Sequence, residues 1–227
     1  MRAGELNPWW RVGLPLVGWL VPLLFRVRVD GIEHVPSSGA AIIAFNHVSV
    51  LDGPVVAIAV GRRLKREARF LVAAELFERP VLGWILKRYD QIPLRRGERD
   101  AAALDEAVGT VKRGALAALA PEGRVNAKPS GRELQRIRSG VGRIALPTGA
   151  PIVPLGIWGT QRRWPREGMT WKRPWRPRLV LSFGVPILPS GEASNADDLQ
   201  SVSERLRERL QTQVAAARAA AGEATDA

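Results

Sequence analysis

Residues 40–53 of this chain are Ala40-Ala41-Ile42-Ile43-Ala44-Phe45-Asn46-His47-Val48-Ser49-Val50-Leu51-Asp52-Gly53. The first six are apolar, as in a strand buried inside a sheet. The strand would end in Asn-His, and a carboxylate follows His47 five residues later. Such a segment can present an imidazole at the edge of a sheet, with Asp52 close enough to orient it. We therefore expect a general base at this point of the fold.

The rest of the chain narrows the chemistry, because it contains no Cys and only two His, His34 and His47. A thiolate nucleophile, a disulfide framework and a Cys-based zinc site are excluded. A metal centre would need a compact cluster of carboxylates around the imidazoles, which the sequence does not supply, so we expect no metal. Ser49 lacks the G-x-S-x-G setting of a nucleophile, and we expect it to cap a helix. Acid–base catalysis by His47 remains, with His34 in a turn.

Composition indicates one domain and anionic partners. The 227 residues are 46% hydrophobic, which suffices for a single large α/β core. The formal charge of +12 favours phosphate-bearing ligands, an acidic carrier, anionic lipid or nucleic acid as partners. We expect no nucleic-acid partner, since the chain has no recognised nucleic-acid motif and only one Tyr and five Phe for base stacking.

The N-terminal segment, residues 1–26, has the features of a membrane-interface segment. Residues 12–25 carry no charge and are flanked by Arg11 and Arg26. This run is shorter than the roughly 20 apolar residues of a spanning helix, and Pro15 and Pro22 favour short or kinked helical pieces. Its Trp and Arg residues favour the headgroup region. The alternatives are a core helix and a signal peptide, although no small-residue cleavage site precedes Val27.

Beyond residue 26 the pattern alternates between short apolar runs and helical stretches, which predicts a single mixed, mostly parallel sheet covered by helices on both faces. We expect one domain over residues 27–217 and a disordered tail over 218–227. The expected strands are 25–29, 41–45, 70–73, 91–94, 115–119, 152–157 and 179–183. The expected helices are 54–64, 81–88, 99–113, 140–148 and an amphipathic helix from residue 196.

Two segments are expected to be loops with possible functional roles. Residues 122–139 combine Gly and Pro with several Arg and Lys, at the end of a predicted strand where α/β proteins place ligands. Residues 160–178 are rich in Trp, Arg and Pro. They suit either a solvated crossover or a second loop that contacts the membrane or covers the substrate.

Four segments, in order and with matching spacing, resemble the motifs of the glycerolipid acyltransferases, and most closely those of the 1-acylglycerol-3-phosphate acyltransferases. The resemblance runs from about residue 29 to residue 188. The third motif departs from the family pattern Pro-Glu-Gly-Thr-Arg-Ser, because its basic residue comes one position early and its Thr is absent. The segments are Asn46-His47-x4-Asp52, Gln91-Ile92-Pro93-Leu94-Arg95-Arg96-Gly97, Ala120-Pro121-Glu122-Gly123 and Ala150-Pro151-Ile152-Val153-Pro154-Leu155.

The resemblance implies transfer of a fatty acyl group from acyl-CoA or acyl-carrier protein to lysophosphatidic acid, at the cytoplasmic face of a membrane and without a cofactor. His47 would take the proton of the acceptor hydroxyl, and Asp52 would hold the imidazole in the productive tautomer. Amides around Gly53 would contribute to an oxyanion site. Alternative acceptors are another lysophospholipid, glycerol-3-phosphate or a glycolipid. A more distant alternative is a basic binding module without catalysis.

The resemblance also implies a substrate-binding set: Arg95, Arg96, Glu122, Gly123 and Arg124. Guanidinium groups bind phosphate in bidentate fashion, although surface arginines are more often only a solvated basic face. Either Arg124 contacts the acceptor phosphate from its shifted position or one of three later arginines, at 132, 136 and 138, replaces it. Glu122 would order the arginines or the acceptor hydroxyls, unless it caps the loop through a salt bridge.

Overall fold

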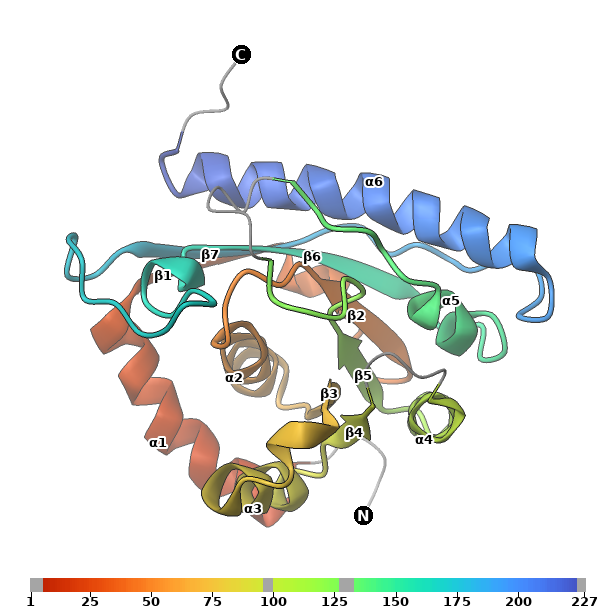
Figure 1. The fold of residues 1–227 in the computed structure, drawn as a ribbon, viewed down its shortest axis with the longest axis horizontal. Helices are drawn as coiled ribbons and strands as arrows, with labels where there is room; N and C mark the ends of the chain where they lie inside the picture. Colours follow the sequence, from red (N-terminus) through yellow and green to blue (C-terminus); the bar gives the residue numbers. More distant parts are fainter. Residues whose placement is uncertain (1–5, 96–99, 127–132, 224–227) are drawn as a thin grey trace.

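The computed structural model describes residues 6–95, 100–126 and 133–223. In these residues seven strands form one sheet at the centre of the molecule (Figure 1). The strands are β1 (Arg26–Asp30), β2 (Ala41–Phe45), β3 (Ala68–Ala73), β4 (Ile92–Leu94), β5 (Leu116–Leu119), β6 (Ile152–Trp158) and β7 (Arg178–Phe183). Their order across the sheet is β1-β7-β6-β2-β5-β3-β4.

The sheet is mixed but mostly parallel, as predicted. The five neighbours β6, β2, β5, β3 and β4 all run in the same direction. β7 is antiparallel to β6, and β1 pairs in parallel with β7. The carboxyl ends of the five parallel strands therefore meet at one edge of the sheet, which is where open α/β folds bind ligands.

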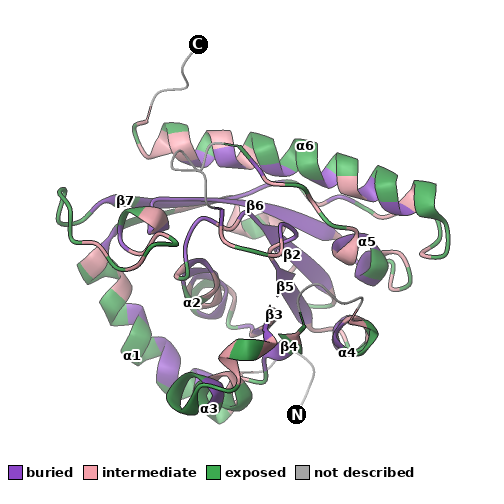
Figure 2. Cartoon of the chain, in the orientation of Figure 1, coloured by how far each residue is buried: buried purple, intermediate pink, exposed green. Residues whose placement is uncertain are grey.

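Helices cover both faces of the sheet. They are α1 (Pro8–Leu24), α2 (Asp52–Leu64), α3 (Pro80–Arg88), α4 (Ala101–Lys112), α5 (Gly140–Ala145) and α6 (Ala196–Ala220). Figure 1 shows α6 along one side of the sheet, with α1, α2 and α3 on the other. Side chains of β2 alternate between the two cores: Ile42 lies in the core shared with α4, α5 and α6, whereas Ile43 lies in the core shared with α2. All five residues of β2 are buried, as the colouring in Figure 2 illustrates.

Helix α1 differs from the short or kinked pieces that the prolines predicted. It is one 17-residue helix, with the Asn7 side chain accepting a hydrogen bond from the Trp10 amide at 3.1 Å. Pro8 occupies the first helical position, where no amide donor is needed. Pro15 and Pro22 lie on the exposed side of the helix. Each removes one intrahelical amide donor, yet the helix continues through both. Among the described residues, no helix combines the length and the apolar character needed to cross a bilayer.

Helix α6 lies against β6 and β7 through a buried apolar row that repeats at helical spacing. Gly156 in β6 permits a close approach, because a Cβ there would lie 2.2 Å from the backbone of Gln213. The helix continues to Ala220, three residues into the segment predicted as a tail. The buried row consists of Leu199, Val202, Leu206, Leu210, Val214 and Ala217.

Candidate active site

The site begins where β2 stops pairing through its backbone. The Asn46 side chain continues the ladder instead: its Nδ2 donates to the Ile157 carbonyl at 3.0 Å, and its Oδ1 accepts from the Ile157 amide at 2.7 Å. Asn46 is buried, so both polar groups of its amide are matched. The main chain can therefore turn away from the sheet at this residue without leaving β6 unpaired. His47 is the next residue.

His47 and Asp52 form a hydrogen-bonded pair. The imidazole Nδ1 lies 2.9 Å from Oδ2 of Asp52, which leaves Nε2 as the nitrogen available to a reacting group. The His47 side chain is 19% exposed, whereas that of Asp52 is wholly buried. The edge of the imidazole also meets the ring of Phe45, with centroids 6.2 Å apart. The arrangement matches what a general base needs: one ring nitrogen held by a carboxylate and the other facing the reaction.

The Asp52 carboxylate is fixed from several directions. Its Oδ2 accepts hydrogen bonds from the amides of Val48 and Ser49, both at 2.8 Å, in addition to contacting His47. Its Oδ1 accepts from the Thr160 hydroxyl at 2.6 Å. Asp52 is the first residue of α2, where the helix dipole also favours negative charge. These contacts leave the carboxylate one orientation, and that orientation sets the position of the His47 ring.

The Glu122 side chain holds the backbone of the same histidine. Oε1 of Glu122 accepts a hydrogen bond from the His47 amide at 2.8 Å, and Oε2 accepts from the Gln135 amide at 2.9 Å. Burial raises the pKa of Glu122, and these two amide hydrogen bonds offset part of that rise. Both oxygens are thus engaged with the main chain. In this structure Glu122 ties the basic loop to the strand that carries His47.

The arginines expected to bind the acceptor phosphate lie farther from His47 than Asp52 and Glu122 do. Arg95 follows β4 and is exposed, at the same edge of the sheet as His47 but three strands away, or about 14 Å at the usual strand spacing. Arg124 is exposed on the loop after β5, the strand next to β2. Arg96 lies outside the described residues, as does residue 132.

Gly123 and Arg138 lie against each other. Gly123 has φ +75°, which a side chain would strain, and a Cβ there would lie 3.1 Å from Nε of Arg138. The Arg138 amide also donates to the Pro121 carbonyl at 2.9 Å. Of the two replacements for Arg124 that the structure describes, Arg136 and Arg138, it is Arg138 that lies against the third motif.

The loop of residues 160–178 is anchored over the site. Ser49 donates its hydroxyl to the Trp164 carbonyl at 2.6 Å and accepts from the Leu51 amide at 3.0 Å. Ser49 is therefore not the N-cap of α2, a position taken by Leu51 without a side-chain hydrogen bond. Arg163 is buried and donates to the carbonyls of Lys172 and Pro174, which closes the loop on itself. A buried guanidinium thus organises a segment that could have been a solvated crossover.

Sequence reasoning missed several members of this site. Thr160 was not singled out, although it is the second residue after β6, at the edge where ligands bind. The amide of Asn126 donates to the His47 carbonyl at 2.6 Å, so both backbone groups of His47 are held by the segment after β5. For Thr160, the available signal in the sequence was its position as a polar residue just after a strand of buried residues. Among residues 6–95, 100–126 and 133–223, no group of three or more His, Cys, Asp or Glu side chains is placed to hold a metal ion.

Replacement of Glu122 by glutamine should change how stability depends on pH. Because the folded-state pKa of Glu122 is raised above its unfolded value, the folded protein keeps a proton that the unfolded chain has already lost. This group therefore makes the free energy of unfolding fall as pH rises from about 4.3 through the folded-state pKa. In Glu122→Gln that fall should disappear, as measured by urea unfolding from mildly acidic to neutral pH.

A matched control is Glu106→Gln. Hydrogen bonding to Arg69 lowers the pKa of Glu106, so the stability that this carboxylate contributes is lost only as pH falls below its unfolded-state pKa. Glu106→Gln should therefore leave the dependence of the unfolding free energy on pH unchanged between mildly acidic and neutral pH. Identical slopes for wild type and Glu122→Gln between mildly acidic and neutral pH would show that burial does not raise the pKa of Glu122.

Comparison with known proteins places this geometry. The family model described as Acyltransferase matches residues 26–158, more than half of the chain. An uncharacterized protein of Mycobacterium leprae is 32% identical over 183 residues, which cover 77% of this chain and 46% of that protein. The chloroplastic 1-acyl-sn-glycerol-3-phosphate acyltransferase BAT2 of Brassica napus is 30% identical over 144 residues, which cover 62% of this chain and 40% of that protein.

The matched region is thus less than half the length of these curated relatives. Among solved structures, the 1-acyl-sn-glycerophosphate (LPA) acyltransferase PlsC of Thermotoga maritima has the same fold, with a TM-score of 0.65 and 24% identity. The superposition covers 90% of this chain and 80% of that chain. The family match extends from β1 to the end of β6 and so includes His47, Asp52 and Glu122. The chain belongs to the Acyltransferase family.

Proposed function

We propose that this protein transfers a fatty acyl group from an acyl thioester to the free hydroxyl of lysophosphatidic acid, giving phosphatidic acid. The proposal rests on the His47–Asp52 pair, in which Nδ1 and Oδ2 lie 2.9 Å apart and Nε2 of the imidazole has no hydrogen-bond partner among the described residues. Membership of the Acyltransferase family supports acyl transfer, and similarity to a 1-acyl-sn-glycerol-3-phosphate acyltransferase of Brassica napus supports lysophosphatidic acid as the acceptor.

The reaction follows from these groups. An acyl thioester is already activated, so the acceptor hydroxyl needs only to lose its proton as it attacks the carbonyl carbon. Nε2 of His47 takes that proton, and Asp52 stabilises the resulting imidazolium. The tetrahedral intermediate then collapses, the carbon–sulfur bond breaks, and the thiolate leaves with the proton from His47. The amides of Val48 and Ser49 are occupied by Asp52, Pro54 has no amide donor, and the Val55 amide donates to the Leu51 carbonyl, so we assign the oxyanion to the amide of Gly53.

Binding of the acceptor phosphate is assigned to arginines at the carboxyl edge of the sheet. Arg124 and Arg138 flank the Gly123 turn next to His47, and Arg95 lies farther along the same edge. Planar guanidinium groups can each make two hydrogen bonds to a phosphate. The donor is acyl-CoA or acyl-carrier protein, since both bring negative charge to a chain with a net charge of +12.

The acceptor is the point to test first. Purified protein would be incubated with acyl-CoA or acyl-carrier protein and a panel of lysolipids, and the products identified by mass spectrometry. We expect phosphatidic acid to form faster than any product of a lysolipid whose phosphate is masked by a neutral or zwitterionic headgroup. Equal use of a neutral lysolipid would remove the role of the arginines. Absence of any acyl transfer would remove the proposed function.

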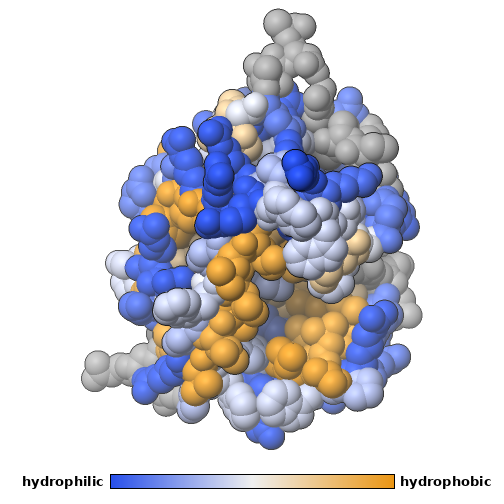
Figure 3. Space-filling view, turned by 90° about the vertical axis from the view of Figure 1, so that its left-hand side faces the viewer, coloured by the Kyte–Doolittle hydropathy of each residue, from blue (hydrophilic) through white to orange (hydrophobic). Residues whose placement is uncertain are grey.

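We also propose that the protein lies on the cytoplasmic face of the membrane, in peripheral or monotopic contact. Side chains of α1 that face away from the core are large and apolar: Leu16 is 71% exposed, Trp19 75% and Leu20 52%. Trp9 of α1 meets Trp84 of α3 edge to face, and α3 adds further exposed apolar side chains. Figure 3 shows hydrophobic side chains gathered on this face, in a ridge and a second area with a hollow between them. Exposed apolar surface of this kind marks a contact site.

Placing charge on this face should release the protein from vesicles. The double variant Leu16→Asp/Leu20→Asp should lose at least about a hundredfold in partitioning to phosphatidylcholine vesicles, because burying each leucine side chain is worth about 1.5–3 kcal/mol. Flotation of protein with vesicles measures this. The matched control is Ser201→Asp/Thr212→Asp, which adds the same charge on the exposed side of α6 and should partition like wild type. Equal losses in the two variants would contradict the contact.

A further inference from the structure

Two arginines on neighbouring strands face each other without a counter-ion. Arg26 and Arg178 are register partners in the parallel pairing of β1 and β7, and both are exposed. Within the described residues, neither makes an ion pair with an acidic side chain. Like charges directly opposite each other on a sheet are destabilising. An anion bound between the two guanidinium groups would reverse the sign of that interaction.

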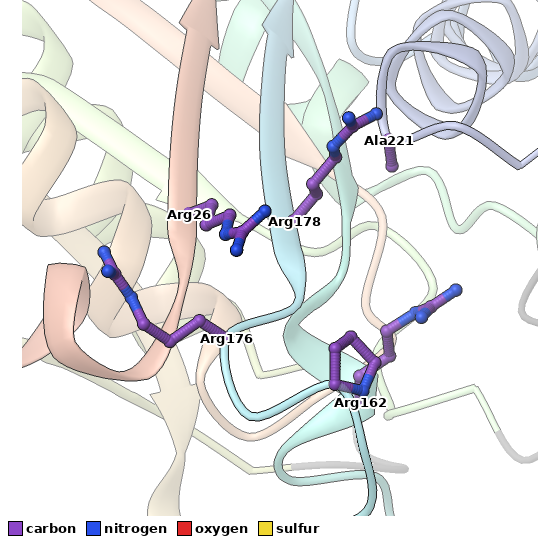
Figure 4. Close-up of a pocket in the computed structure, with 6 residues that line it drawn as sticks. Arg26, Arg162, Arg176, Arg178 and Ala221 are labelled. Carbon is purple, nitrogen blue, oxygen red and sulfur yellow. The ribbon is translucent and has the colours of Figure 1, made fainter.

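These arginines line a cavity of about 200 Å³, which we name the arginine pocket: Arg26, Arg162, Pro174, Arg176, Arg178 and Ala221. Figure 4 shows the Arg178 side chain directed toward Ala221 and the Arg26 side chain extending toward β7, while the guanidinium of Arg176 points away from them. Arg162 comes from the beginning of the loop of residues 160–178, Arg176 and Arg178 come from its end, and Arg26 begins β1. The fold thus brings two distant parts of the chain together around these guanidinium groups.

Groups within the protein neutralise only part of this charge. Arg162 forms an ion pair with Glu223. Arg178 lies beside the C-terminal end of α6, because a Cβ on Gly222 would lie 2.9 Å from its Nη1. That helix end carries partial negative charge, which is about half an elementary charge at most. The arginine pocket therefore keeps a net positive charge.

The arginine pocket is separate from the candidate active site but adjoins the end of α1. Arg178 alternates with Leu179, a residue of the core next to α2, so Arg178 points to the opposite face of the sheet from His47 and Phe45. Arg176 donates to the carbonyl of Phe25, the residue that caps α1, at 3.5 Å. The pocket thus lies at the end of the helix that carries the exposed apolar side chains.

We propose that the arginine pocket binds the phosphate of an anionic phospholipid headgroup in the membrane on which α1 lies. This rests on the membrane contact put forward under the proposed function. Guanidinium groups at a bilayer surface bind lipid phosphates through paired hydrogen bonds. The exposed Trp175, between two lining residues, is a side chain that prefers the headgroup region. A cavity of this size is smaller than the roughly 300–1,000 Å³ of pockets for whole small molecules, so it suits one phosphate rather than a nucleotide.

Binding there would fix the rotation of the protein about α1. An apolar helix alone leaves the domain free to roll on the surface, whereas a second contact at one end of the helix selects one orientation. The phosphate bound at this point is not the substrate's, since His47 lies on the other face of the sheet.

The test is vesicle binding by Arg26→Gln/Arg178→Gln. These two residues are exposed, so the substitutions remove charge without opening the core. On phosphatidylcholine vesicles containing phosphatidylglycerol, the variant should bind about thirty-fold less tightly than wild type, from about 1 kcal/mol for each basic residue at an anionic surface. On pure phosphatidylcholine vesicles it should bind about as wild type does. Arg26→Lys/Arg178→Lys, which keeps the charges, should retain most of the preference for anionic vesicles.

The matched control is Arg143→Gln/Arg205→Gln, which removes the same charge from exposed positions on α5 and α6. It should lose less than about threefold, since charges farther than a Debye length from the bilayer are screened. Equal losses in the two Gln variants, or none in Arg26→Gln/Arg178→Gln, would overturn the proposal.

Two further experiments are needed. The first distinguishes a lipid phosphate from a soluble phosphate, and the second distinguishes membrane binding from the proposed catalysis. Inorganic phosphate or coenzyme A at matched ionic strength should not release the wild-type protein from anionic vesicles, and release to the level of the variant would assign the pocket to a soluble ligand instead. His47→Ala should bind vesicles like wild type. Because binding is read without turnover, failure of the lipid site leaves the acyltransferase proposal standing, and the reverse also holds.

Discussion

His47→Ala should form phosphatidic acid about 10²- to 10⁴-fold more slowly than wild type, the usual worth of a positioned general base. The acceptor hydroxyl would then have to lose its proton to water as it attacks. The loss should fall on kcat rather than on KM, because the imidazole is needed only as charge develops. Steady-state rates with saturating lysophosphatidic acid and acyl thioester measure it. Added imidazole should recover part of the rate by occupying the vacated space.

The control for this result is His34→Ala, the only other histidine substitution the chain offers. His34 Nδ1 lies 2.9 Å from the Phe183 carbonyl, a contact that involves neither His47 nor Asp52. That variant should keep wild-type kcat. Far-UV circular dichroism should show both variants folded, since the His47 side chain is partly exposed and contributes little to the core. A folded His47→Ala protein with wild-type turnover would end the assignment of this residue as the base.

Asp52→Asn should also lower kcat by about 10²- to 10⁴-fold, for a different reason. In serine hydrolase triads the same change leaves the histidine in the wrong tautomer. Here the carboxylate is approached by the amides of Val48 and Ser49, the Thr160 hydroxyl and the His47 ring. A carboxamide has a single oxygen and must turn its NH₂ toward one of these donors. The variant should therefore also be less stable, by about 1–3 kcal/mol for each buried group left unmatched.

Thr160 allows catalysis and stability to be separated. Thr160→Val removes only the donor to Oδ1 of Asp52, so it should lower the free energy of unfolding by about 1–3 kcal/mol and lower kcat far less than Asp52→Asn does. Thr160→Ser restores the hydroxyl and should recover both. Urea unfolding and steady-state kinetics on the same preparations compare the three variants. If Asp52→Asn were destabilised with kcat unchanged, Asp52 would serve the fold alone.

The sheet could be predicted because most of its strands are short apolar runs bounded by Gly, Pro and polar residues, whereas β1 alternates Arg with Val. The expected strand at 41–45 coincides with β2, and the other six differ from the observed strands by at most two residues at either end. The proximity of His47 and Asp52 was also accessible, because one turn at a strand end and the first residue of a helix join them. The features formed by residues close in sequence could therefore be predicted from the sequence alone.

The remaining members of the site depend on strand order, which periodicity does not report. Glu122 reaches the His47 amide across 75 residues, and Thr160 reaches Asp52 across 108, because β5 and β6 flank β2 in the sheet. The pairing of Arg26 with Arg178 likewise depends on β1 joining the sheet beside the antiparallel β7. Helix α1 continues through Pro15 and Pro22, although proline usually kinks or ends a helix, and no local pattern indicates this continuity. Each requires three-dimensional placement before any residue can be given a role.

The Asn46 carboxamide carries a lesson for protein engineering. Its amide group takes the place of a peptide unit and hydrogen-bonds to Ile157 of β6, at 3.0 and 2.7 Å, at the point where the backbone of β2 turns away from the sheet. Anyone transplanting the His–Asp pair into a different parallel sheet would have to bring this mimic along with it. With alanine at this position, the amide and carbonyl of the neighbouring strand would be buried without hydrogen-bond partners, and the transplanted histidine would follow a strand end that is no longer paired.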